Sequence, residues 1–340
     1  MTKLTAGFNP FCLFLLFILM FPDVGNTQPK KLFRIGTGGK TGVYYPIGKL
    51  IAQGLTEASK DKDTAATGKR GLTDYIGVAQ NSAGSVANLE AIVSGEVEAG
   101  LVQADVASRA YKSLGVFSGN KEFESIRAVA SLYPEKFQII TRSDAKINSV
   151  FDLKGKRISL DEIGSGTLSV MQIILEAHGL SERDLHPVYL KPEFTRDKMI
   201  SGELQGFVMM AGTPMESALC LSGIGISLVP IQKDIAFNIN RRYPYLVPGK
   251  VSANVYPGIP ETPTIQVYAL LVVSSEMDDD LIYQVTSSLW SNHTQTLLHQ
   301  GHPQGKSIVP ESALVGLSIP LHEGAKRFYR ELKFLKREIE

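Results

Sequence analysis

Short apolar runs alternate along this chain with segments whose apolar residues recur at helical spacing. Continuous runs of Val, Ile, Leu and Ala are typical of strands that are buried on both faces of a sheet. The strands predicted in this way are 32–35, 76–79, 99–102, 128–132, 137–141, 157–160, 206–210, 226–230 and 265–273. Strands that alternate with helices predict an α/β protein with mainly parallel sheets flanked by helices.

Helices are predicted where apolar residues share one face, and each has a recognisable start or end. The segments are 86–93, 168–178, 281–290 and a charged C-terminal helix over 322–340. Ser85 is expected to cap the first of them, and Gly95 and Gly179 are expected to end the first and the second. Asp278 to Asp280 open the third, where negative charge suits the helix dipole.

The first predicted strand leads into a glycine-rich loop, Ile35 to Pro46, with the sequence IGTGGKTGVYYP. A helical pattern begins at Ile47, and Pro46 fits a first helical position because its missing N–H would be unpaired there. A strand, a glycine loop and a helix N-terminus leave several backbone N–H groups free at the positive end of a dipole. The segment is therefore suited to bind a carboxylate or a phosphate.

Two nucleotide-binding motifs do not fit this loop. Gly39-Lys40-Thr41 matches the end of a Walker phosphate loop, but Arg34 stands where that motif needs glycine, and Pro46 would break its helix. A dinucleotide fingerprint would need a third small residue at Thr41. We therefore expect no nucleotide cofactor, although the loop alone leaves open a turn that binds nothing.

Eight further segments follow the glycine loop in the order of one family's motifs. They are 84–89 (GSVANL), 101–107 (LVQADVA), 131–135 (SLYPE), 152–157, 164–167 (GSGT), 211–214 (AGTP), 256–258 (YPG) and 320–329. Together they cover residues 32 to about 330, and the chain resembles the TAXI proteins, the solute-binding subunits of one branch of the TRAP transporters. Its departures lie in loops: Lys40 replaces the usual Thr, Val43 replaces a smaller residue, and 80–83 and 162–163 differ.

This resemblance implies a two-lobed periplasmic binding protein of the type II class, with ligand in the cleft between the lobes. Lobe one would comprise 29–133 and 265–340, and lobe two 134–264, with crossings near Tyr133–Lys136 and Glu261–Thr264. Closure around the ligand would be a hinge motion. The family implies a small organic anion, a carboxylate such as glutamate or 2-oxoglutarate, delivered to TRAP membrane permease subunits.

The candidate ligand-binding residues are Gly, Ser and Thr at expected helix starts, together with nearby polar side chains. In lobe one they are Gly39, Lys40, Thr41, Tyr44, Tyr45, Ser82, Ser85 and Gln103. In lobe two they are Ser165, Gly166, Thr167, Gly212 and Thr213. The tyrosines could instead pack in the core, and Gln103 could instead cap a loop. Lys40 could point into solvent, or it could contact a second carboxylate of the ligand.

The N-terminal sequence predicts where the protein is located, and its net charge limits the partners that it can bind. Phe11 to Phe21 is an apolar run of eleven residues after Lys3, too short to span a bilayer and suited to a signal peptide, 1–27. We expect cleavage between Val24 and Gln28 and a periplasmic product, with an uncleaved anchor as the alternative. A net charge of +1 without a basic stripe argues against nucleic acid. Cys220 would be the one mature cysteine, expected in the core and without a disulfide.

Catalytic motifs find little support. Ser165 lacks the glycine spacing of a nucleophile elbow, and the acidic runs 161–162 and 278–280 are contiguous instead of separated across a substrate. His293, His299 and His302 have poor spacing for metal ligands and are expected at the surface. We expect a monomeric binding protein with no metal and no catalytic residues. A receptor for a sensor, or an enzyme on the same scaffold using Lys40 or a tyrosine, remain the alternatives.

Overall fold

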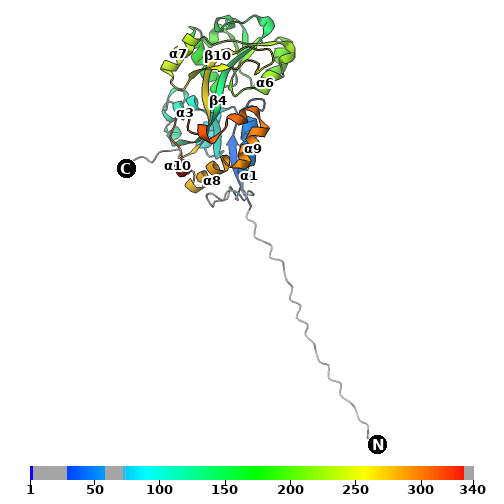
Figure 1. Cartoon of the computed structure of the whole chain (residues 1–340), viewed down its shortest axis with the longest axis vertical. Coiled ribbons are helices and arrows are strands. Elements are labelled where there is room, and N and C mark those ends of the chain that lie inside the picture. Colours follow the sequence, from blue (N-terminus) through cyan, green and yellow to red (C-terminus); the bar gives the residue numbers. More distant parts are fainter. Residues whose placement is uncertain (3–28, 58–71, 73, 333–340) are drawn as a thin grey trace.

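The computed structural model describes residues 1–2, 29–57, 72 and 74–332. Residues 3–27 of the predicted signal peptide and the last part of the predicted C-terminal helix lie outside these residues. In Figure 1, helices α1, α8, α9 and α10 gather at one end of the molecule, and α6 and α7 lie at the other. Strands β4 and β10 run between the two ends.

Ten strands form one sheet within the described part of the chain. They are β1 (Lys31–Gly36), β2 (Tyr75–Gln80), β3 (Ala99–Gln103), β4 (Ile126–Arg142), β5 (Arg157–Ser159), β6 (His186–Val188), β7 (Gly206–Ala211), β8 (Ile226–Leu228), β9 (Val247–Val251) and β10 (Thr262–Ser274). Their order is β2-β1-β3-β10-β4-β7-β5-β6, with β8 beside β4 and β9 beside β10.

The sheet is mixed, so the prediction of mainly parallel sheets needs correction. Strands β1, β2 and β3 pair in parallel, as do β5, β6 and β7, but β4 and β10 are antiparallel to all their neighbours. The predicted strands 128–132 and 137–141 are two parts of β4, which continues through Pro134. Pro134 pairs with Tyr268 of β10 in regular register, and a register shift follows between Ala269 and Leu270, where Leu132 of β4 has no partner in the ladder.

The two long strands join the two halves of the sheet. The Ala269–Val273 part of β10 pairs with β3, whereas its Thr262–Gln266 part pairs with β9. Gln266 lies beside Lys136 and Ala269 beside Tyr133. The lobe boundaries remain a prediction, and this register leads us to propose 266–269 for the second crossing in place of Glu261–Thr264.

Helices cover the sheet and provide the loop ends that face the site. They are α1 (Tyr44–Glu57), α2 (Ser85–Val93), α3 (Ala104–Tyr111), α4 (Gly166–Ala177), α5 (Arg196–Ser201), α6 (Glu216–Leu219), α7 (Lys233–Arg242), α8 (Asp279–Leu289), α9 (Asn292–Gly301) and α10 (Glu323–Glu331). Asp278 caps α8 by accepting from the Leu281 N–H at 2.8 Å.

Two expected helix starts differ in detail. Pro46 is the third residue of α1, which begins at Tyr44. Gly84, with φ 101°, holds the N-cap position of α2, so Ser85 is its first residue and its hydroxyl accepts from the Gln103 N–H at 3.0 Å. The serine therefore links α2 to the end of β3 instead of capping its own helix.

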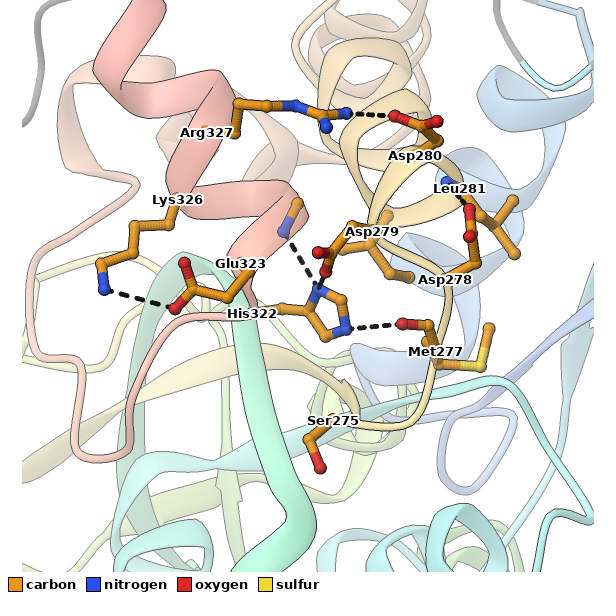
Figure 2. Close-up of polar contacts among 12 residues, drawn as sticks. Ser275, Met277, Asp278, Asp279, Asp280, Leu281, His322, Glu323, Lys326 and Arg327 are labelled. Carbon is orange, nitrogen blue, oxygen red and sulfur yellow. Dashed lines mark hydrogen bonds and ion pairs between the residues drawn. The ribbon is translucent and has the colours of Figure 1, made fainter.

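The C-terminal segment is fixed to the centre of the first half. Leu321 bridges to Ala128 of β4, and the Tyr329 hydroxyl of α10 donates to the Val129 carbonyl at 3.1 Å. Figure 2 shows the start of α10, where His322 Nδ1 accepts from the Gly324 N–H at 3.2 Å. Its Nε2 lies 3.1 Å from the Met277 carbonyl. This residue is 2% exposed and ties α10 to the loop before α8.

Two predictions about single residues were wrong. Cys220 is exposed and holds the C-cap position of α6, at the end of the short helix instead of in its buried face. His302 is half-buried, and its Nδ1 accepts from the Gln304 N–H at 3.1 Å to cap a 3₁₀ turn over Pro303–Ser307. The other two histidines of that group behave more like surface residues: His299 is exposed and His293 lies 2.9 Å from Glu57.

Candidate functional site: a cavity between the halves of the sheet

A narrow cavity of about 30 Å³ lies between loops from both halves. The first half contributes the glycine loop with the start of α1, the start of α2 and the end of β3, and β4, which joins the halves, contributes Glu135. The second half contributes the segment after β5 with the start of α4, Pro192, and the end of β7. The polar and glycine residues among the lining are Gly38, Gly39, Gly42, Tyr44, Gly84, Ser85, Gln103, Glu135, Asp161, Glu162, Ser165, Gly166 and Thr167.

The glycine loop packs closely against the second half. A side chain at Gly39 would lie 2.6 Å from Glu193 Oε2, and one at Gly42 would lie 3.2 Å from Met209 Cε. The Gly42 N–H donates to the Gly39 carbonyl at 3.1 Å and closes a turn. The loop therefore lies in close contact with the second half at both glycines, and a Cβ at either position would require the facing Glu193 or Met209 side chain to shift.

Asn88 of α2, which the sequence reasoning did not single out, braces this loop. Its Nδ2 donates to the carbonyls of Thr37 and Leu101, each at 2.7 Å, and its Oδ1 accepts from the Ser82 hydroxyl at 2.6 Å. A Cβ at Gly36 would lie 2.6 Å from Asn88 Oδ1. The asparagine thus holds β1, β3 and the following loop together, and Ser82 serves this network instead of lining the cavity.

The start of α4 forms the opposite wall. The Ser165 hydroxyl caps the helix by accepting from the Leu168 N–H at 3.1 Å, and the Thr167 hydroxyl accepts from the Met210 N–H at 3.2 Å. A Cβ at Gly166 would lie 2.4 Å from Gln103 Oε1, so this helix start touches the first half directly. The predicted pairing of GSGT with a helix N-terminus is therefore present at the cavity.

Three carboxyl groups line the cavity, and sequence reasoning missed them as site residues. Glu135 is 1% exposed; its Oε2 accepts from the Tyr44 hydroxyl at 3.0 Å, and its Oε1 has no partner. Burial raises the pKa of Glu135 well above its usual value. Asp161, at φ 67°, also has its pKa raised by burial, to about 7. The sequence signal for Glu135 was an acid between two predicted apolar strands, 128–132 and 137–141.

Cations are absent from the residues that line this cavity. Lys191 and Arg109 are each paired with an acid, and one of these acids, Glu162, itself lines the cavity. Lys191 Nζ lies 3.7 Å from Glu162 Oε1, and Arg109 Nη2 lies 3.0 Å from Asp105 Oδ2. Across the described ranges, no group of three or more His, Cys, Asp or Glu is arranged to hold a metal ion.

The remaining predicted site residues lie beside the cavity instead of lining it. Lys40 is exposed, and Tyr45 is partly buried with its ring 5.9 Å from Lys49 Nζ. The Thr41 hydroxyl is buried without a partner. Gly212 and Thr213 adjoin Gln304, whose Oε1 accepts from the Thr213 N–H at 3.0 Å. Ligand contact remains a prediction for all of the candidates.

The sequence matches the NMT1-like family over residues 35–332. The chain belongs to that family. Within the described part of the chain, no helix has both the length and the apolar character needed to cross a membrane.

Solved structures with a similar fold include the periplasmic binding protein BugD. BugD is 11% identical, with a TM-score of 0.53, and the match covers 90% of this chain and 98% of that one. PhnD1 from Prochlorococcus marinus (MIT 9301), solved with methylphosphonate, is 9% identical with a TM-score of 0.53 and covers 90% and 99%. A protein from Bordetella bronchiseptica RB50 is 16% identical with a TM-score of 0.53 and covers 92% and 91%. The predicted two-lobed binding-protein fold is confirmed.

Proposed function

We propose that this protein is an exported receptor that captures a small organic anion and delivers it to a membrane permease. The observation that carries the proposal is the composition of the cavity wall. Loops from both halves of the sheet line the same small space, and the halves are joined by two long strands. A ligand held there contacts both halves, so binding favours the arrangement in which they meet.

A carboxylate is the anion that we propose. The wall contains the start of α4 and the glycine loop before α1, and both expose backbone N–H groups at the positive end of a helix dipole. Anions bind at such positions without a neighbouring Lys or Arg, which agrees with the absence of cations from the cavity lining. Glutamate and 2-oxoglutarate stay the named candidates.

The transporter type that we propose is TRAP, with the receptor in the periplasm. This proposal is supported by the segments that match TAXI motifs in the same order along the chain, from the glycine loop to residues 320–329. The likeness to PhnD1 concerns the fold, since the two sequences are 9% identical. Methylphosphonate therefore enters as a competitor to be tested and not as a second candidate.

The experiment is a thermal-shift screen of the mature protein, followed by calorimetry. The panel contains amino acids, oxo acids, dicarboxylates, alkanesulfonates and methylphosphonate. We expect carboxylates to raise the melting temperature and to bind with a stoichiometry of one. A response to sulfonates or phosphonates alone would overturn the choice of anion.

The transporter type needs a separate measurement. Labelled ligand and purified receptor are added to membrane vesicles that contain the cognate permease, with either an ion gradient or internal ATP as the energy source. Uptake that follows the gradient supports the TRAP type. Uptake that requires ATP contradicts it and leaves the receptor function intact.

A further inference from the structure

Gln103 and Glu135 each place a buried, unpartnered oxygen at the cavity. Gln103 is 3% exposed and Glu135 is 1% exposed, and neither Oε1 atom has a hydrogen-bond partner. Buried polar atoms nearly always have partners, because an unpaired one costs about 1–3 kcal/mol. The Gln103 oxygen is an acceptor, and the Glu135 oxygen is an acceptor once its carboxyl is ionised, so a donor that also carries a positive charge fits both.

Within the described part of the chain, the acids beside these acceptors, Glu135 and Asp161, form no ion pair with a Lys or Arg side chain. Asp161 lines the same cavity, and Glu135 interacts with the hydroxyl of Tyr44 and, electrostatically, with Tyr133 and the carboxyl of Asp105. Arg109 is held by Asp105, and Lys191 by Glu162, so neither cation neutralises Glu135. Burial of acids without a counter-charge is unfavourable unless a proton or a ligand supplies the positive charge.

Asp161 is held in place by the backbone as well as by its neighbours. Its φ of 67° is in the left-handed region, which costs free energy for a residue other than glycine. Its Oδ1 accepts from the Glu162 N–H at 2.9 Å, and the hydroxyls of Ser165 and Thr167 also face it. The fold therefore maintains a carboxyl beside the start of α4, where a ligand carboxylate is proposed to bind.

We infer that Glu135, Gln103 and Asp161 form a subsite for a ligand ammonium group, so that the solute is an amino acid and not the oxo acid of the same skeleton. This inference rests on the proposed function as a carboxylate receptor. An ammonium group has three donors and a positive charge, which matches acceptors on both halves of the sheet. The helix start and the glycine loop bind the carboxylate of the same zwitterion.

The test compares matched ligand pairs that differ only in the amine: L-glutamate with 2-oxoglutarate, L-alanine with pyruvate, and L-leucine with 4-methyl-2-oxopentanoate. Calorimetry of the wild-type mature protein should show the amino acid of at least one pair binding at least tenfold more tightly than its oxo acid. Equal affinities within each pair, or tighter binding of the oxo acids, would overturn the ammonium subsite and leave the carboxylate receptor standing. If no carboxylate binds, the proposed function fails and the subsite fails with it.

The variants Glu135→Gln and Asp161→Asn remove charge and keep shape. Asparagine also tolerates the left-handed conformation of position 161. Each should weaken binding of the preferred amino acid at least tenfold and leave its oxo acid within threefold of wild type. Glu276→Gln, at an exposed acid, is the matched control and should change neither. An equal loss for both ligands in both variants, with melting temperatures unchanged, would show that the acids do not recognise the amine.

Proton release gives an independent readout. An ammonium group stabilises the carboxylate forms, so acids that are protonated in the free protein lose protons on binding. Calorimetry in buffers of different ionisation enthalpy should show protons released at pH 7, and fewer in Glu135→Gln. Affinity for the amino acid should rise from pH 6 to pH 8, and proton uptake on binding would contradict the inference.

Discussion

Replacement of Asn88 by alanine tests whether this side chain holds the glycine loop in place. The change removes two N–H donors to the carbonyls of Thr37 and Leu101 and the acceptor for the Ser82 hydroxyl. Each hydrogen bond contributes about 1 kcal/mol, so we expect the free energy of unfolding to fall by about 3 kcal/mol. A domain is typically stable by roughly 5–15 kcal/mol, so the protein should still fold.

The assay is equilibrium unfolding in urea, followed by circular dichroism. Asn148→Ala is the matched control because Asn148 is exposed, and its effect should stay within about 0.5 kcal/mol. Asn88→Asp keeps the shape but replaces the donating amide with an acceptor, so it should destabilise at least as much as alanine. Ligand affinity should fall as well, because Thr37 leads directly into Gly38 and Gly39 at the cavity.

A loss below about 1 kcal/mol for Asn88→Ala would refute this reasoning. It would mean that the backbone hydrogen bonds of the strands are enough to hold the loop. The hydrogen bonds of the Asn88 amide would then be no more favourable than the bonds that the same groups make with water in the unfolded chain. An unchanged free energy of unfolding together with a large loss of ligand affinity would instead show that Asn88 acts in ligand binding and does not hold the loop in place.

Three further outcomes are expected. Gly166→Val should abolish ligand binding in calorimetry, because its Cβ would lie 2.4 Å from Gln103 Oε1; unchanged affinity would remove the start of α4 from the site. Lys40→Thr should change affinity for L-glutamate less than twofold, because Lys40 is exposed, whereas a tenfold loss would show that it contacts a second carboxylate. Burial lowers the pKa of His322 below 6.5, against the opposing effect of Asp279. The folded protein therefore favours the neutral ring, and its free energy of unfolding should fall as the pH drops from 6.5 towards the folded-state pKa. In urea unfolding, the free energy of unfolding of His322→Asn should fall less between pH 7.5 and pH 5 than that of the wild type.

The local part of the fold could be predicted from the sequence. The glycine loop between β1 and α1, and the cap at Ser165, depend on residues close together in the chain. The antiparallel pairing of β4 with β10 could not, because it joins segments far apart and is fixed by the register of the whole sheet. The apolar pattern of β4 gave its strands correctly but not their continuity through Pro134.

The candidate site was predictable in its loops but not in its acids. Glu135 lies between two predicted strands, and only the observed path of β4 places its side chain at the cavity. Asp161 and Glu162 were set aside because they are adjacent in the sequence. The structure separates their environments, since Asp161 is buried beside α4 and Glu162 pairs with Lys191. Exposure of Lys40 likewise depends on contacts that no local pattern reports.

The return of β10 into the first half has a consequence for the order in which the protein folds. β3 pairs with β1 on one side and with the Ala269–Val273 part of β10 on the other. Until β10 has been synthesised, β3 has an open edge and the first half lacks its central strand. Contacts between segments so distant in the chain form slowly, because a long loop must close first. The newly made chain therefore cannot complete its sheet until its last quarter has emerged from the ribosome, a delay that would keep it open for the export that we propose.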